Sequence, residues 1–219
     1  MKITYKDIMQ NKAVRTYIKK EDESLKELGY TEHSFKHVVR VAEYASKILI
    51  ELGYDEREAE LARIAGYLHD IGNVINRIDH AQSGAIMSFR ILDKMGADAE
   101  DIATIITAIG NHDESTAFPV NAVSAALIIA DKTDVRRTRV RNQDITTFDI
   151  HDRVNYAVTE STLKIEKNNG ITLELCVDTS ICSLADYFEI FLERMLLCRK
   201  AAEKLEEEFK LIINGQRMI

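Results

Sequence analysis

The sequence predicts a mainly α fold: a helical bundle followed by a small C-terminal α+β unit with the order strand, strand, helix, strand. Apolar residues recur at helical spacings through about the first 140 residues. Pro119 is the single proline among 219 residues, which favours long uninterrupted helices. Alternation with the period of a strand begins only after Arg141. We therefore expect a helical domain over residues 1–145 and an appendage over residues 146–219.

Capping residues and glycines predict where the helices begin and end. Asp55, with Glu58 three residues later, has the spacing of a capping box, and Asn121 precedes a strongly apolar run. Glycine commonly ends a helix because it adopts the left-handed conformation at little cost. The expected helices cover residues 4–28, 31–52, 55–70, 79 or 83 to about 96, 98–110, and 121 through 129.

The tail has a different pattern. Residues 158–167 and 171–177 alternate as strands do, and Asn168-Asn169-Gly170 between them is a favourable hairpin turn. A long helix is expected over residues 183–205 and a last strand over residues 209–213. The resulting sheet has two candidate neighbours, the helical domain and a second copy of the chain. A homodimer through this unit is therefore one expected assembly.

Composition restricts the partners and the compartment. The chain has 29 Lys and Arg against 36 Asp and Glu, a net charge of -7, so we expect no extended nucleic-acid surface, although a local basic patch remains allowed. Its cysteines, Cys176, Cys182 and Cys198, form no CxxC pair, which favours a reduced cytoplasmic compartment. No apolar run approaches the roughly 20 residues of a membrane span, and no signal-peptide pattern is present. We expect a soluble cytoplasmic protein without a membrane partner.

His69 and Asp70 stand side by side in the segment from Gly66 to Asn73, which is otherwise apolar or small. Neutral imidazole and carboxylate are both good ligands for first-row divalent metals. Adjacent residues of a helix point about 100° apart, so the two side chains reach one point only if the helix end turns both inward. For the doublet alone, a helix cap or a buried hydrogen bond is the simpler explanation.

Further histidines and an aspartate stand on or at the ends of the other expected helices: His37, His80, His112 and Asp131. Asp131 directly follows the apolar run of residues 125–130, where a carboxylate loses its hydration unless it is paired, hydrogen-bonded or metal-bound. Each histidine alone has a structural explanation. One shared metal site accounts for the whole set with fewer separate coincidences.

The order of these residues resembles the HD superfamily of metal-dependent phosphohydrolases, and the resemblance covers roughly residues 31–141. Five segments carry it: His37-Val38-Val39-Arg40-Val41-Ala42, Leu68-His69-Asp70-Ile71-Gly72, His80 with Gly84 and Ala85, Ile109-Gly110-Asn111-His112-Asp113-Glu114, and Ile128-Ile129-Ala130-Asp131-Lys132. The tail lies outside it.

The resemblance implies an HD-type helical bundle with a two-metal site. One metal would be held by His37, His69, Asp70 and Asp131, and the second by His80 and His112 with Asp70 as the bridge. The implied reaction is hydrolysis of a phosphate ester or phosphoanhydride bond in a small phosphorylated compound, with a nucleotide favoured, through attack of a metal-bound hydroxide. Nitrogen and oxygen ligands suit several divalent ions, and similarity to dinuclear relatives favours Fe over Mn, Zn, Mg, Co or Ni.

Some positions depart from particular branches of the family. The branches that cleave cyclic dinucleotides carry a lysine where this chain has Asn73, and a Gly-Tyr-Pro element that is absent here. The alarmone-hydrolase branch has a Glu-Asp pair where this chain has Asn73-Val74-Ile75-Asn76. The diadenosine polyphosphate hydrolase branch is the nearest in its ligand pattern.

Basic residues follow Asp131 over the segment 132–141. Guanidinium groups bind phosphate oxygens in pairs, so we expect Arg136 or Arg137 to act in catalysis as a phosphate clamp, ahead of Arg139 and Arg141. The alternative is a solvated helix end, where the helix dipole favours positive charge.

Several points stay open. His33 lies one turn before His37 and is the alternative first ligand, His151 is expected on the surface, and Asp113 could complete the second metal's shell or act near it. Some dinuclear-iron relatives are oxygenases, so an oxygen-consuming iron pair is an alternative function. A non-catalytic signalling or dimerisation module is the other alternative, but such a module would be expected to have lost some of the ligands.

Overall fold

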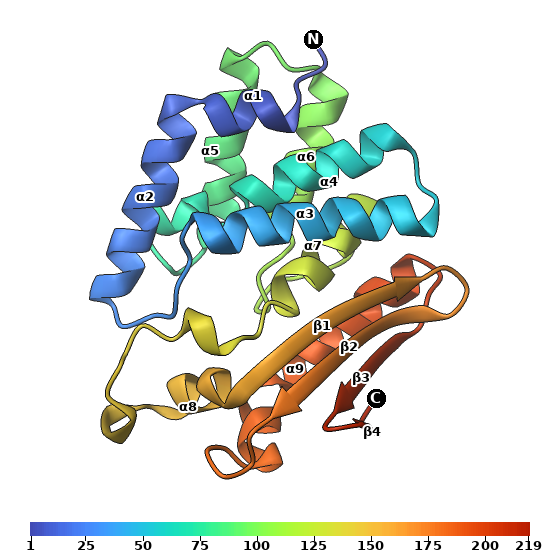
Figure 1. Ribbon diagram of the computed structural model, residues 1–219. Helices are drawn as coiled ribbons and strands as arrows, with labels where there is room; N and C mark the ends of the chain where they lie inside the picture. The colour runs from blue at the N-terminus through green and yellow to red at the C-terminus, as the bar shows by residue number, and fades with distance from the viewer.

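The computed structural model describes residues 1–219 and contains nine α-helices and one four-stranded sheet (Figure 1). The helices are α1 (Tyr5–Gln10), α2 (Lys12–Glu27), α3 (Phe35–Leu52), α4 (Glu56–Leu68), α5 (His80–Lys94), α6 (Ala99–Gly110), α7 (Ala122–Lys132), α8 (Ile150–Ala157) and α9 (Leu184–Lys204). The strands are β1 (Val158–Glu166), β2 (Gly170–Val177), β3 (Phe209–Ile213) and β4 (Gln216–Arg217), and three short 3-10 turns are η1 (Ile71–Val74), η2 (Arg137–Arg139) and η3 (Ile145–Thr147). The expected mainly α fold with a strand-strand-helix-strand tail is confirmed.

Local capping explains where the observed helices differ from the expected ones. The first expected helix is two, because the Asn11 side chain accepts hydrogen bonds from the Ala13 and Val14 amides and starts α2. The α3 helix starts after Ser34, whose side chain caps it, rather than at residue 31. Helix α8 and the two-residue strand β4 were not expected from the sequence.

Helices α3 and α4 pack together closely and cross the centre of the molecule in Figure 1. The contact depends on Gly66, because a Cβ atom there would lie 2.7 Å from the Cα atom of Ala42 on α3. Only a glycine allows two helix backbones to approach in this way without displacement. The contact fixes the last turn of α4, which leads into His69 and Asp70, against the helix that carries His37.

The sheet has the order β1-β2-β3-β4. Strands β1 and β2 form an antiparallel hairpin, whereas β2 and β3 are parallel and are connected through α9. Helix α9 packs between the sheet and α7, and β1 also touches α3 (Figure 1). One buried apolar cluster contains residues from both sides of position 145, so the tail covers the helical bundle and shares its core. The domain division at residue 145 and the homodimer stay predictions.

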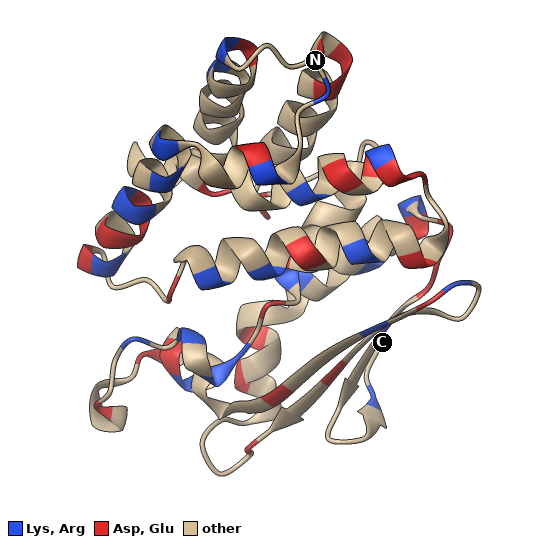
Figure 2. Ribbon diagram, turned by 45° about the horizontal axis from the view of Figure 1, so that its top comes forward, with Lys and Arg blue, Asp and Glu red and all other residues tan.

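None of the helices combines the length and the apolar character that crossing a bilayer requires. In the view of Figure 2, basic and acidic residues are interspersed along the helices rather than gathered on separate sides. The ionisable side chains of the candidate metal centre, described next, differ from these because they are largely buried between helices.

The close approach at Gly66 gives a stability prediction. We expect Gly66→Ala to lower the free energy of unfolding by about 1–3 kcal/mol, because the added methyl group must displace backbone. Gly110→Ala is the matched control, since a Cβ there would meet Ala85 at an ordinary 3.7 Å. Urea denaturation of both variants measures the difference. Equal midpoints for the two variants would contradict the role given to Gly66.

Candidate metal centre

The four histidines and two aspartates singled out in the sequence come together in the structure. His37 lies in the first turn of α3, His80 is the first residue of α5, and His112 follows the end of α6. His69 and Asp70 lie between α4 and the turn η1, and Asp131 is the penultimate residue of α7. Each histidine is at most 2% exposed. Five separate segments therefore place these groups in one buried volume.

All four imidazoles are held in the same way, with Nδ1 donating a hydrogen bond to a fixed acceptor. The acceptors are Asp134 Oδ2 for His37 (2.8 Å), Gly66 O for His69 (2.8 Å), Arg77 O for His80 (3.0 Å) and Ile109 O for His112 (2.6 Å). Because these acceptors are carbonyl or carboxylate oxygens, Nδ1 carries the proton and Nε2 is left to face the centre. The buried Nε2 atoms of His37 and His69 have no hydrogen-bond partner in the chain.

Asp70 presents its two oxygens to two different pairs of histidines. Its Oδ2 lies 3.1 Å from Nε2 of His69 and 3.5 Å from Nε2 of His37. Its Oδ1 lies 3.5 Å from Nε2 of His80 and 3.9 Å from Nε2 of His112. Asp131 Oδ1 joins the first pair at 3.4 Å from His37 and 3.7 Å from His69. A carboxylate with its oxygens divided in this way has the arrangement of a bridging ligand.

The donor set fits divalent metals. Three groups have their ligand atoms within 4.8 Å of one another: His37, His69 and Asp70; His69, His112 and Asp131; and Asp70, His80 and His112. Each group combines imidazole nitrogen with carboxylate oxygen and contains no thiolate, a combination that suits Zn, Mn, Fe and related ions. The unpartnered Nε2 atoms supply the lone pairs that such an ion needs.

The pKa values of the centre also indicate that its two carboxylates, Asp70 and Asp131, attract positive charge. Burial lowers the pKa of His69, but the nearby carboxylates of Asp70 and Asp131 outweigh it and raise the pKa to about 10. Burial and the charge of His69 lower the pKa of His112 to about 3. A proton on His69 would balance the charge of the two carboxylates, and a bound cation would balance the same charge.

Asp134 holds His37 in position and was missed as a functional residue in the sequence. Besides its bond to His37, its carboxylate contacts Nε of Arg40 at 3.0 Å and Nε of Arg136 at 2.6 Å, while Arg139 donates to its backbone oxygen at 3.0 Å. Burial acts to raise the pKa of Asp134, but the hydrogen bond from His37 and the neighbouring arginines hold it far below its usual range. The residue therefore stays ionised and fixes the orientation of the imidazole.

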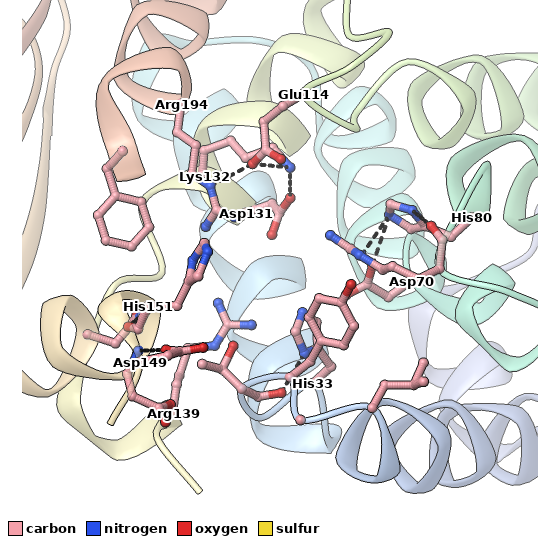
Figure 3. Close-up of a pocket in the computed structure, with 18 of the residues that line it drawn as sticks. His33, Asp70, His80, Glu114, Asp131, Lys132, Arg139, Asp149, His151 and Arg194 are labelled. Atoms are coloured by element: carbon pink, nitrogen blue, oxygen red, sulfur yellow. Dashed lines mark hydrogen bonds and ion pairs between the residues drawn. The ribbon is translucent and has the colours of Figure 1, made fainter. Parts of the chain in front are cut away.

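A cavity of about 350 Å³ opens beside the centre and is lined by Asp70, His80, His112 and Asp131 (Figure 3). Four cationic side chains also line it: Arg77, Lys132, Arg139 and Arg194. Nζ of Lys132 lies 2.7 Å from Asp131 Oδ2 and 3.3 Å from Glu114 Oε1, and Nε of Arg194 lies 2.7 Å from the same Glu114 oxygen. These charges are positioned for an anion that approaches the centre.

The structure does not bring Arg136 and Arg137 to this cavity, so the clamp expected of them is corrected. Arg136 binds Asp134, and Arg137 donates from Nε to the Tyr156 backbone oxygen and packs over the Tyr156 ring at 4.3 Å. The reason is that α7 ends at Lys132 and the chain then turns through η2, so successive arginines diverge. Of this basic run, Lys132 and Arg139 line the cavity.

The three residues left open in the sequence have distinct places. His33 lines the cavity, but its Nδ1 donates to Thr31 O at 2.7 Å and the residue belongs to none of the ligand groups. His151 is exposed, as expected, and it also lines the cavity from α8. Asp113 Oδ1 lies 3.9 Å from His80 Nε2, and its Oδ2 accepts a hydrogen bond from Ser115.

Glu21 is a further buried acid near the centre. It lies on α2 and is fully buried, and neither carboxyl oxygen has a hydrogen-bond partner. Burial raises its pKa well above the ordinary value, and the charge of Asp70 adds to the effect. The side chain is therefore held as a neutral acid.

Comparison with known proteins gave one family and a set of relatives. The family model described as "HD domain" matches residues 34–190. The ribonuclease Y of Aster yellows witches'-broom phytoplasma is 27% identical over 190 residues, which is 86% of this chain and 33% of that protein. An uncharacterised protein of Methanocaldococcus jannaschii is 26% identical over 212 residues, covering 86% of this chain and 80% of that protein.

A second ribonuclease Y, from Geobacillus thermodenitrificans, is 27% identical over 180 residues, covering 82% of this chain and 32% of that protein. The chain therefore spans about a third of the length of these ribonuclease Y proteins. A solved structure of a predicted HD superfamily hydrolase from an uncultured Thermotogales bacterium is 26% identical, with a TM-score of 0.45 over 57% of this chain and 67% of that chain.

The first prediction from this geometry concerns Asp134. We expect Asp134→Asn to weaken metal binding roughly 10- to 100-fold, because the neutral amide no longer holds His37 in a charge-assisted hydrogen bond. Titration calorimetry with Mn²⁺ or Zn²⁺ measures the affinity. Asp144→Asn, at a surface carboxylate that caps η3, is the matched control and should bind as the unmodified chain does. Equal affinities for both variants would contradict the role of Asp134.

The second prediction concerns Glu21 and pH. Below about pH 4.5 the carboxyl is protonated in both the folded and the unfolded chain, so it adds no pH dependence. Above that pH only the unfolded chain ionises, so the wild-type stability falls by up to about 1.4 kcal/mol per pH unit until the raised folded pKa is passed. Glu21→Gln lacks this loss.

We therefore expect the stability of Glu21→Gln, relative to wild type, to increase from pH 5 to pH 8. Urea denaturation at both pH values, with a chelator present, measures the difference. Glu27→Gln, at an exposed position of the same helix, is the control and should show no such trend. A relative stability of Glu21→Gln that does not change with pH would rule out a buried neutral acid at this position.

Proposed function

The chain belongs to the HD domain family, and from that premise we propose that it is a metal-dependent phosphohydrolase acting on a small phosphorylated compound. The observation that carries the proposal is the placement of the Asp70 carboxylate. Its two oxygens face two different pairs of histidine Nε2 atoms. A pair of metals needs a buried carboxylate that bridges them, whereas an acid with a purely structural role has no need to divide its oxygens in this way.

The distances support one division of the ligands between two ions. His37, His69, Asp70 and Asp131 would hold one divalent metal, and His80, His112 and Asp70 would hold the other. Bound there, the metals would supply a Lewis acid for a phosphoryl oxygen and lower the pKa of a coordinated water. The donor set is compatible with Fe, Mn, Zn, Mg, Co or Ni, and we favour Fe.

The side chains of the cavity would bind and orient the phosphate. Lys132 is buried, and although burial lowers its pKa, the charges of Asp131 and Glu114 raise it above the ordinary value, so it stays a cation. Arg194 is steadied by Glu114 and by the Phe191 ring, 5.0 Å from its guanidinium. Together with Arg77, these groups can donate to phosphate oxygens while the reacting phosphorus faces Asp70.

The named relatives raise a second substrate class. Ribonuclease Y is named for cleaving RNA, and a phosphodiester of RNA is therefore an alternative to a small compound. We favour the small compound because the cavity is walled on one side by residues of α8 and α9 and has a volume of about 350 Å³. Ligand sites of this size suit nucleotide-sized molecules.

Two variants test the metal count. We expect Asp70→Ala to lose both metal ions and all activity, because it removes the bridging ligand. His112→Ala should keep about one of the two metal ions per chain. Elemental analysis of freshly purified protein measures metal per chain. His151→Ala, which removes a cavity histidine outside the ligand groups, is the control and should keep the wild-type metal content. Full turnover by Asp70→Ala would exclude the proposed site.

The reaction is tested by a phosphate-release screen over nucleotides, dinucleoside polyphosphates, sugar phosphates and a short RNA, with the metal-replete chain and with Asp70→Ala. Running the screen with and without oxygen separates hydrolysis from oxygenase chemistry, since hydrolysis needs no oxygen. Release by the wild type alone, unchanged without oxygen, supports the proposal. No release from any compound, or a requirement for oxygen, would overturn it.

A further inference from the structure

The cavity has a second wall that comes entirely from residues after the segment resembling the HD motifs. Helix α8 contributes His151, Asp152 and Asn155, with Asp149 just before it, and α9 contributes Phe191 and Arg194. In the view of Figure 3, His151 and Arg194 lie on the opposite side of the cavity from Asp70 and His80. The tail is thus part of the site and not only a cover for the bundle.

The two sides of the cavity differ in chemistry. On the metal side, Arg77 and Lys132 are cations beside the ligands. The α8 side offers two carboxylates, Asp149 and Asp152, and the one arginine that the adjoining α9 contributes to the cavity, Arg194, is paired with Glu114 at 2.7 Å. Arg139 also faces the cavity, but its guanidinium is committed to the backbone oxygens of Glu32 and Asp134 and lies 3.8 Å from the Asp134 carboxylate.

The α8 side retains hydrogen-bonding capacity. Asn155 donates from Nδ2 to the His151 backbone oxygen, which leaves its own carbonyl oxygen as an acceptor. The Asp149 side chain caps the helix at the Asp152 amide, whereas the Asp152 carboxylate caps nothing. Acceptors of this kind bind hydroxyl and amino groups and repel a second phosphate or carboxylate.

From this asymmetry we propose that α8 recognises the alcohol part of a phosphomonoester, through His151 and Asp152, while the phosphate faces Lys132 and the metal centre. The substrate class is a monophosphate whose alcohol carries hydroxyl or amino donors and no second anionic group, such as a nucleoside or sugar monophosphate. This inference rests on the proposed phosphohydrolase function and narrows it. It disfavours dinucleoside polyphosphates, because their remaining phosphates would meet Asp149 and Asp152.

The test separates recognition from turnover by measuring binding to the metal-stripped chain with calorimetry. The probes are AMP, ribose 5-phosphate, adenosine 3′,5′-bisphosphate and inorganic phosphate. We expect the wild type to bind at least one of the two monophosphates more tightly than the bisphosphate. Asp152→Asn and His151→Ala should each weaken that monophosphate about tenfold, as expected for the loss of a hydrogen bond to a polar or charged group.

Two controls guard against a general loss of structure. Inorganic phosphate should bind each variant within twofold of the wild type, because it occupies only the metal side. Asp93→Asn removes one carboxylate from the exposed surface of α5, outside the cavity lining, and should bind every probe as the wild type does.

The outcomes distinguish this inference from the function on which it rests. Monophosphate binding that is unchanged in both α8 variants, tighter binding of the bisphosphate, or no binding of either monophosphate overturns the recognition role. If binding behaves as expected but the metal-replete chain releases no phosphate from AMP, ribose 5-phosphate or p-nitrophenyl phosphate, the hydrolase function fails while the α8 site stands. Phosphate release together with unchanged binding in the variants overturns the α8 site alone.

Discussion

The structure depends on the burial of Asp70 between two pairs of imidazoles. A carboxylate that is 3% exposed is costly unless positive charge or hydrogen bonds compensate it. Burial acts to raise the pKa of Asp70, yet His69 and His37 hold it well below its usual range, so the group stays ionised. The fold must therefore deliver nitrogen atoms to both carboxylate oxygens, and the contacts around the centre serve that requirement.

Adjacent residues of a regular helix cannot both face one point, and the chain avoids this by ending α4 at Leu68 and turning through η1. Gly72 makes the turn compact, because a Cβ there would lie 2.0 Å from the His80 backbone oxygen. The same glycine thus brings the start of α5, with His80, against the doublet. The absence of a side chain at this one position therefore sets how closely two ligand-bearing segments approach.

Local features of the chain could be predicted from sequence, and long-range ones could not. The caps at Asp55 and Asn121 were predictable because a capping side chain bonds amides within three residues of itself. Asp134 was not, because its partner His37 lies 97 residues away. The clamp expected at Arg136 and Arg137 assumed that the chain continues towards the cavity after Asp131, but the path through η2 is set by contacts with Tyr156 and Asp134.

The metal centre and the tail are joined by a chain of charges. Asp131 binds Lys132, Lys132 binds Glu114, and Glu114 binds Arg194 of α9. A lysine that is 5% exposed keeps its charge only because carboxylates lie on both sides of it, and Glu114 is in turn shared with the tail. The family match to residue 190 also continues past the helical bundle into α9. A ligand of the centre and a wall of the cavity are therefore held by one network, so the helical bundle without its tail would lack part of the site.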